Sequence, residues 1–86
     1  MKTIVCFSDK FTYLQDVVVL EDNKVIHEYE TDHDALPQLL FNVAKQYDVN
    51  TIRFIGMSFF MEDIQQQISE MEQKEYGTSN IILVKG

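Results

Sequence analysis

Few residues of this chain are of a kind that performs chemistry, and they lie far apart in the sequence. Its one cysteine, Cys6, lies inside the apolar run Ile4–Phe7, which favours a small buried side chain over a reactive thiol. A single cysteine forms no internal disulfide. Without a CxxC pair or a Cys/His cluster, the sequence does not predict a structural zinc site. The two histidines, His27 and His33, are too isolated for a metal site, so we expect both at the surface.

Ser58 follows a feature that is typical of ligand sites in α/β proteins. The stretch Thr51–Met57 predicts a strand, Gly56 allows a sharp turn at its end, and Ser58 is expected to cap the next helix. Free backbone N–H groups would then lie at the carboxyl edge of a sheet, where ligands bind in open α/β sheets. These groups could hold an anion, as any helix start could, but no histidine is placed to activate the Ser58 hydroxyl.

Hydrophobic periodicity predicts the elements that position these residues. Apolar runs indicate five strands, and stripes at helical spacing indicate two helices. The predicted strands cover Lys2–Ser8, Tyr13–Glu21, Lys24–Thr31, Thr51–Met57 and Asn80–Lys85, and the predicted helices cover His33–Tyr47 and Phe59–Tyr76. Asp22 and Asn23 predict a hairpin turn, and Gly77 predicts the end of the second helix.

The resulting order, β-β-β-α-β-α-β, predicts a single α/β domain over residues 1–86. Short turns make the first three strands an antiparallel meander, and right-handed crossovers make the last two parallel to the first. The expected order in the five-stranded mixed sheet is 3-2-1-4-5, with the second strand antiparallel to the rest. The strand at Thr51–Met57 is apolar on both faces, which predicts cover on both sides; a doubly wound sheet would carry one helix on each face.

Charge and hydropathy narrow the class of partner and the compartment. The formal net charge is −7, and the seven basic residues are scattered along the chain rather than gathered in a stripe. Nucleic-acid binders draw most of their affinity from neutralised phosphates, so this composition disfavours nucleic acid as a partner. No apolar run approaches the roughly 20 residues that cross a membrane. We therefore expect a cytoplasmic protein that does not enter the membrane.

The order of elements resembles the ribonuclease H-like fold, in the compact form of Holliday junction resolvase-like proteins. This resemblance covers the whole chain and implies a metal-dependent nuclease, in which carboxylates hold Mg²⁺ or Mn²⁺. It implies Asp9, Glu62 and Asp63 as catalytic metal ligands. The family's acid at the end of the fourth strand is replaced here by the run Gly56–Ser58, and the DxG turn of the related actin-like ATPase domains is also missing. The alternative roles are a turn residue for Asp9 and helix-start charge for Glu62 and Asp63.

Two aromatic and two acidic residues suggest a contact surface instead. Phe59 lies about 140° from the centre of the second helix's apolar stripe, and Phe41 lies on the flank of the first helix's stripe. A helix that began one residue later would instead pack Phe59 under the turn. Glu28 and Glu30 put charge on one face of an expected edge strand. These features favour a non-catalytic interaction module without a cofactor, which self-associates or binds a protein partner; a divergent nuclease is the alternative.

Overall fold

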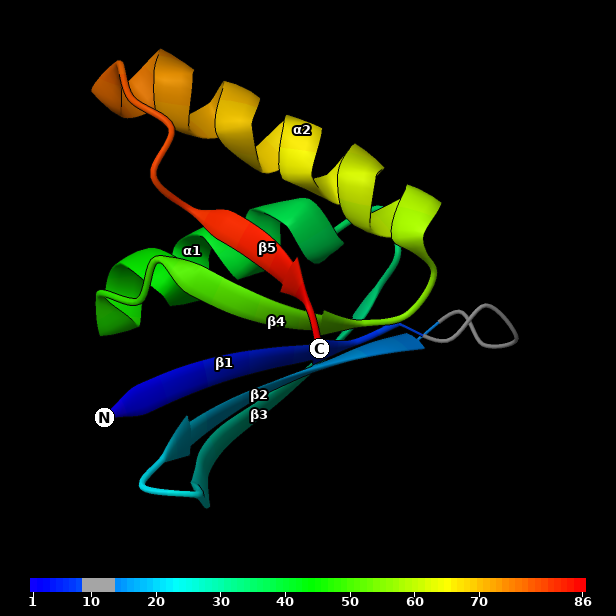
Figure 1. The fold of residues 1–86 in the computed structure, drawn as a ribbon, viewed down its shortest axis with the longest axis vertical. Coiled ribbons are helices and arrows are strands. Elements are labelled where there is room, and N and C mark those ends of the chain that lie inside the picture. The colour runs from blue at the N-terminus through cyan, green and yellow to red at the C-terminus, as the bar shows by residue number, and fades with distance from the viewer. Residues whose placement is uncertain (9–13) are drawn as a thin grey trace.

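The computed structural model describes residues 1–8 and 14–86, and these residues form five strands and two helices (Figure 1). The elements are β1 (Lys2–Phe7), β2 (Leu14–Glu21), β3 (Lys24–Asp32), α1 (Leu36–Tyr47), β4 (Thr51–Ile55), α2 (Ser58–Tyr76) and β5 (Ile82–Lys85). The strands form a single sheet in the order β3-β2-β1-β4-β5. β1 pairs antiparallel with β2 and parallel with β4, and β5 pairs parallel with β4, which confirms the predicted order and directions.

The β2–β3 hairpin has the predicted turn and one feature that was not predicted. Asp22 and Asn23 both adopt the left-handed backbone conformation, with φ of 51° and 68°, as a two-residue hairpin turn requires. The register then shifts between Val19 and Leu20, so that Leu20 faces Val25 while Val19 faces His27. This bulge moves Val25 to the opposite face from His27. In a strictly alternating strand, Val25 and His27 would share a face.

Helix α1 begins three residues later than predicted, at Leu36 instead of His33. Pro37 explains the difference, because proline has no N–H to donate and fits only the first turn of a helix. The Asp32 carboxylate accepts a hydrogen bond from the Ala35 N–H at 2.8 Å and closes the turn before the helix. The helix ends at Asp48, whose backbone is left-handed with φ of 54°.

Helix α2 begins one residue earlier than predicted. Ser58 is its first residue rather than its cap, and the cap position belongs to Met57, whose side chain makes no capping bond. The expected capping role of Ser58 is therefore wrong. Gly77 ends the helix with φ of 70°, as predicted. Neither described helix has the length and apolar character needed to cross a membrane.

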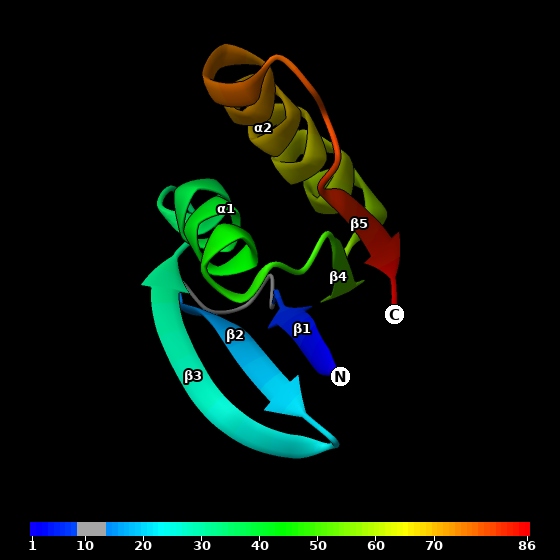
Figure 2. The ribbon, with the colours of Figure 1, turned by 90° about the vertical axis from the view of Figure 1, so that its left-hand side faces the viewer.

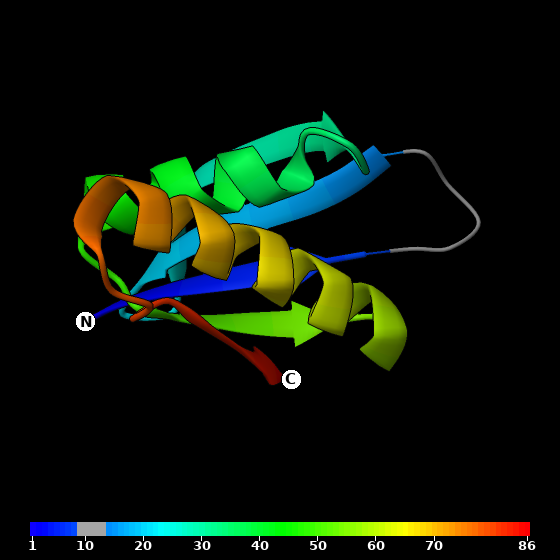
Figure 3. The ribbon, with the colours of Figure 1, turned by 90° about the horizontal axis from the view of Figure 1, so that it is seen from above.

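Both helices pack on the same face of the sheet (Figures 2 and 3). We call this the covered face. The apolar residues that the strands, and Ile81 just before β5, contribute to its core are fully or almost fully buried: Ile4, Cys6, Val17, Val19, Ile52, Phe54, Ile81 and Leu83. Helix residues that include Leu36, Leu40, Ile64 and Ile68 complete this core. The expected helix on each face is wrong, because right-handed crossovers that step in the same direction along a sheet place their helices on the same side.

Candidate functional site

The carboxyl ends of β1 and β4 meet closely at Gly56. The Ser8 N–H donates a hydrogen bond to the Ile55 carbonyl at 2.9 Å. A side-chain Cβ at Gly56 would lie 2.9 Å from the Ser8 carbonyl oxygen and 3.0 Å from the Phe54 ring. Gly56 does not adopt a positive φ, whereas Gly77 does. The glycine is therefore required for close approach of the two strand ends, not for the sharp turn that the sequence predicted.

Two of the three predicted ligand residues, Glu62 and Asp63, can be placed in the structure, and they form no metal-binding cluster with other described residues. Glu62 and Asp63 are exposed near the start of α2, and Asp63 accepts a hydrogen bond from Gln67 Nε2 at 3.1 Å. Ser58 Oγ accepts a long contact of 3.5 Å from Lys85 Nζ. Asp9 lies outside the described residues. Within residues 1–8 and 14–86, no three His, Cys, Asp or Glu side chains come together to hold a metal ion. The set of Asp9, Glu62 and Asp63 stays a prediction.

Cys6 is fully buried on the covered face, as predicted. Burial raises the pKa of its thiol to about 12, and the negative charge of Asp16 adds to this rise. A thiol with this pKa is neutral at physiological pH, and the thiolate is the nucleophilic form. Cys6 therefore acts as a core residue.

Both histidines contact aromatic side chains. His27 is exposed, as predicted, and stacks on Tyr29 with ring centroids 4.0 Å apart. Its Nδ1 lies 3.1 Å from the Tyr29 hydroxyl oxygen and 3.3 Å from that of Tyr47. His33 is half-buried and meets the edge of Phe60 at a centroid distance of 5.0 Å. These contacts connect β3 to α1 and the start of α1 to the start of α2.

The two aromatic residues that were expected at a contact surface, Phe59 and Phe41, differ in how much of their surface is exposed. Phe59 is 57% exposed, and its ring packs against Phe60 at 4.2 Å between centroids. Phe41 is only 6% exposed and belongs to the core, with Tyr76 tilted against it. The expectation that Phe41 lies off the core is wrong, since α2 covers the flank of α1. Phe41 has little surface left for a partner, whereas Phe59 keeps most of its own.

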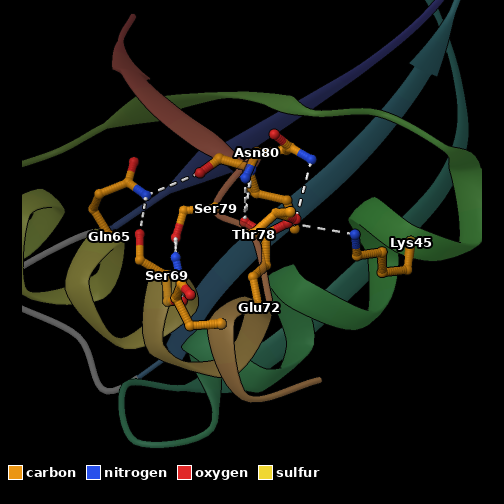
Figure 4. Close-up of polar contacts among 9 residues, drawn as sticks. Lys45, Gln65, Ser69, Glu72, Thr78, Ser79 and Asn80 are labelled. Carbon is orange, nitrogen blue, oxygen red and sulfur yellow. Dashed lines mark hydrogen bonds and ion pairs between the residues drawn. The ribbon is translucent and has the colours of Figure 1, made fainter. Parts of the chain in front are cut away.

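A buried carboxylate in α2 fixes the chain that leads into β5 (Figure 4). Glu72 is fully buried, and its Oε1 accepts hydrogen bonds from the Asn80 and Ile81 N–H groups at 2.9 and 2.7 Å. Its Oε2 lies 3.4 Å from Lys45 Nζ on α1. Sequence reasoning missed this residue, although a signal was present. Glu72 follows Ile64 and Ile68 at intervals of four, on the buried stripe of the helix.

Gln65 completes this polar network at the outer side of β5 (Figure 4). Its Nε2 donates to the Ile81 carbonyl at 2.9 Å, and its Oε1 accepts from the Leu83 N–H at 2.6 Å. β5 is an edge strand, and unpaired edge groups readily pair with another chain. The side-chain amide of Gln65 occupies these groups as a neighbouring strand would. Gln65 and Glu72 are therefore structural, and they hold the second helix against the last strand.

A shallow hollow of about 530 Å³ lies at the end of the sheet away from Gly56, where β1 and β4 begin. It is lined by Met1, Lys2, Thr3, Tyr47, Asp48, Val49, Asn50, Thr51 and Arg53. This hollow lies at the amino ends of β1 and β4, whereas ligands of open α/β sheets bind at the carboxyl ends. It contains none of Ser58, Glu62 and Asp63, and so it is not part of the predicted site.

The side of the sheet that faces away from both helices is the open face. Strand registers place on it Thr3, Val5, Phe7, Asp16, Val18, Leu20, Val25, Glu28, Glu30, Thr51, Arg53, Ile55, Ile82 and Val84. Neighbours bury Val5 and Val18 at its centre. Phe7, Ile55, Ile82 and Val84 remain between 39% and 54% exposed. The two-sided cover predicted for the strand at Thr51–Met57 is therefore wrong within the described structure, which leaves a largely apolar surface.

The charges on the open face are divided between its two sides. Asp16, Glu28 and Glu30 lie on β2 and β3, and Arg53 lies on β4. The charge of Asp16 raises the pKa of Glu28, and a hydrogen bond between the two carboxyl groups contributes next. Among the described residues, no ion pair within 4.0 Å joins Arg53 or Glu28 to an opposite charge. One side of the face is thus acidic and the other basic.

Comparison with known proteins supports the fold class. No protein-family model matches the chain, and no curated protein matches it. A solved structure from Bacteroides thetaiotaomicron VPI-5482, a protein with actin-like ATPase fold and unknown function, is similar to it with a TM-score of 0.61 and 13% sequence identity. The match covers 95% of this chain and 31% of that one, so this chain spans about a third of the length of that protein. At this identity the similarity shows the fold alone.

This chain therefore has an α/β fold, with a five-stranded mixed sheet in the order 3-2-1-4-5 and two helices. Actin-like ATPase folds fall in the ribonuclease H-like class, so the similarity is compatible with the class that the sequence suggested.

Proposed function

We propose that this chain is a small protein-interaction module whose open face is the binding surface. One observation carries the proposal: four large apolar side chains, Phe7, Ile55, Ile82 and Val84, lie exposed on one face of the sheet. Apolar surface gathered in this way marks interaction sites, because its removal from water is favourable. Both described helices lie on the other side, so the cover for this face comes from outside the described fold.

The charges on this face favour a protein over a nucleic acid as its partner. Asp16, Glu28 and Glu30 outnumber Arg53, and a surface with an excess of carboxylates repels phosphates. Glu28 and Glu30, which the sequence suggested as contact residues, lie on the acidic side of the open face. Phe59, which the sequence also suggested as a contact residue, lies at the start of α2 and is a further exposed apolar residue.

Within the ribonuclease H-like class, we propose that this chain has the compact Holliday junction resolvase-like form. Support comes from the order β-β-β-α-β-α-β, in which α1 connects β3 to β4 and α2 connects β4 to β5. The proposed role does not require the catalytic carboxylates of that family, since it depends on the sheet surface alone.

Photo-crosslinking tests the role of the open face. p-Benzoylphenylalanine is placed at Ile55 on the open face and, as a matched control, at the exposed Gln66 on α2. The chain is irradiated in the cells from which it comes, and its adducts are identified by mass spectrometry. We expect a covalent adduct with a polypeptide from position 55 in clear excess over position 66. Equal yields from the two positions would show that the open face is not the binding surface.

A further inference from the structure

One row of side chains crosses the open face from strand to strand. The strand registers align Glu28 with Val18, Val18 with Val5, Val5 with Arg53, and Arg53 with Val84. The row therefore has an acid near one end, two valines in the middle and a base beyond them. Adjacent strands are about 4.8 Å apart, so Glu28 and Arg53 of the same chain are separated by about 14 Å and do not pair.

A two-fold axis that runs along β1, parallel to the strands, would make this face complementary to itself. The rotation places β1 against β1, β2 against β4 and β3 against β5 of the other copy. Arg53 of one copy then lies over Val18, next to Asp16 and Glu28 of the other. The exposed Phe7 side chains of the two copies, also on β1, lie against each other, and sheets that pack in this way are about 10 Å apart.

A second pair of apolar residues obeys the same symmetry. Val25 on β3 is 61% exposed, and Ile82 on β5 is 54% exposed. Val25 pairs with Leu20 and Ile82 pairs with Thr51, so both lie on the open face at the same end of the sheet. The axis along β1 brings each against the other of the second copy. The most exposed apolar residues on the two outer strands would therefore cover one another.

Within the described residues, the charged side chains Asp16, Glu28 and Arg53 form no ion pair with an opposite charge. Asp16 and Glu28 lie close enough to share a hydrogen bond, and their mutual repulsion raises the pKa of Glu28. A guanidinium presents several N–H donors in a plane, which suits it to a pair of carboxylates. Arg53 of another copy supplies that cation without any change in the fold.

We propose that a second copy of this chain covers the open face as a two-fold dimer, with Arg53 of each copy against Asp16 and Glu28 of the other. This inference rests on the proposed function and names its partner. The exposed apolar residues around the centre, Phe7, Ile55, Ile82 and Val84, supply most of the binding energy, and the two charge contacts fix the direction in which the sheets meet. The net charge of −7 on each copy opposes association and is screened at physiological salt, where the Debye length is about 8 Å.

Charge reversal on the two sides of the face tests the dimer. Sedimentation equilibrium is measured at about 0.15 M NaCl and neutral pH for the wild type, Arg53→Glu and Glu28→Arg. We expect a wild-type dimer and an increase in Kd of roughly tenfold or more for each variant, since each places like charges together.

Mixing the two variants in equal amounts should restore association as a heterodimer. The carboxylate introduced at position 53 of one copy then meets the guanidinium introduced at position 28 of the other, while the second contact between the two copies is native. Lys74→Glu and Glu70→Arg, which change exposed residues of α2, are matched controls and should leave Kd unchanged.

A second measurement uses the wild type alone, so a variant that fails to fold does not remove the test. A mixture of isotope-labelled and unlabelled chains is examined by filtered nuclear Overhauser spectroscopy. Contacts between the methyl groups of Val25 and Ile82 in different copies are expected. A wild type that is monomeric up to high concentration, or a dimer indifferent to Arg53 and Glu28, would overturn the second copy as the partner. In either case, a crosslink from position 55 to a different protein would leave the proposed function standing.

Discussion

The two faces of the sheet are built from the same strands, and both are rich in apolar residues, yet only one is covered. On β4, Ile52 and Phe54 are buried under the helices, whereas Arg53 and Ile55 point to the open face. On β5, Leu83 is buried and its neighbours Ile82 and Val84 are exposed. Apolar residues on both sides of a strand therefore predict burial of both sides without showing that the same chain provides it. The difference between the faces identifies the surface that requires a partner.

The largest expected loss of stability comes from the helices that cover one face of the sheet. Glu72→Ala removes the acceptor of two backbone N–H groups and leaves Lys45 without its partner. We expect a loss of about 3–5 kcal/mol in the free energy of unfolding, because the Ile81 N–H that is left without an acceptor is buried. Urea denaturation measures this loss. Glu70→Ala, at an exposed position of the same helix, should change the free energy by less than about 0.5 kcal/mol. Similar losses for both variants would contradict the structural role of Glu72.

Two isoleucines of β4 compare the faces directly. Ile52 is fully buried on the covered face, and Ile55 is 39% exposed on the open face. At a protein concentration low enough to keep the chain monomeric, Ile52→Ala should cost about 2–5 kcal/mol of unfolding free energy, and Ile55→Ala less than about 1 kcal/mol. The order of the two effects should reverse when dimerisation is measured: Ile55→Ala should raise the Kd of the dimer more than Ile52→Ala does. Equal destabilisation of the monomer would mean that the open face is covered within one chain.

A smaller effect is expected where the ends of β1 and β4 meet. Gly56→Ala places a methyl group 2.9 Å from the Ser8 carbonyl oxygen and 3.0 Å from the Phe54 ring, which belongs to the covered face. The strands must separate slightly, at a cost of about 1–3 kcal/mol. Gly77→Ala meets no atom within 4 Å and is strained only by its φ of +70°, so about 1 kcal/mol is expected. Thermal unfolding of both variants checks the order, and a greater loss for Gly77→Ala would refute the role of close approach.

The smallest effect belongs to the carboxyl pair of the open face. The pKa of Glu28 is raised above its ordinary value of 4.5, first by the charge of Asp16. The folded chain thus binds this proton more tightly than the unfolded chain, and the resulting stability is present below pH 4.5 and lost as the pH rises past the raised pKa. Glu28→Gln should therefore raise the Tm of the monomer slightly at neutral pH, and the gain should vanish at low pH.

Calorimetry from acidic to neutral pH follows this change. Glu62→Gln, at an exposed carboxyl group of α2, serves as the control and should show no such trend. A constant difference between Glu28→Gln and the wild type at every pH would show that repulsion from Asp16 is not its cause.

Local patterns predicted most of the fold. Asp22–Asn23 fixed the hairpin, and short turns with right-handed crossovers led to the observed strand order. The same crossover rule, applied to both helices, would also have placed them on the correct side of the sheet. Both connections, from β3 to β4 and from β4 to β5, step in one direction along the sheet, so both helices must lie on one side. The position of Pro37 likewise indicates the start of α1, although the helix was predicted to begin at His33.

The candidate site was less accessible to sequence reasoning. The roles of Glu72 and Gln65 depend on which backbone groups of β5 lie opposite them, and no local pattern states this. The bulge that moves Val25 to the open face depends likewise on pairing between β2 and β3. Phe41 lay on the edge of its stripe, where the position of the neighbouring helix decided its burial. Contacts between distant segments determine each of these features.

The network around Glu72 also bears on the order in which the chain folds. Glu72 bonds to Asn80 and Ile81, only eight and nine residues further on, whereas β5 meets β4 across about thirty residues, from Thr51 to Ile82. Short loops close at a lower entropic cost than long ones. We therefore expect β5 to dock first on α2 and to join the sheet afterwards as part of that unit. The last strand of the sheet would thus reach its place already attached to a helix.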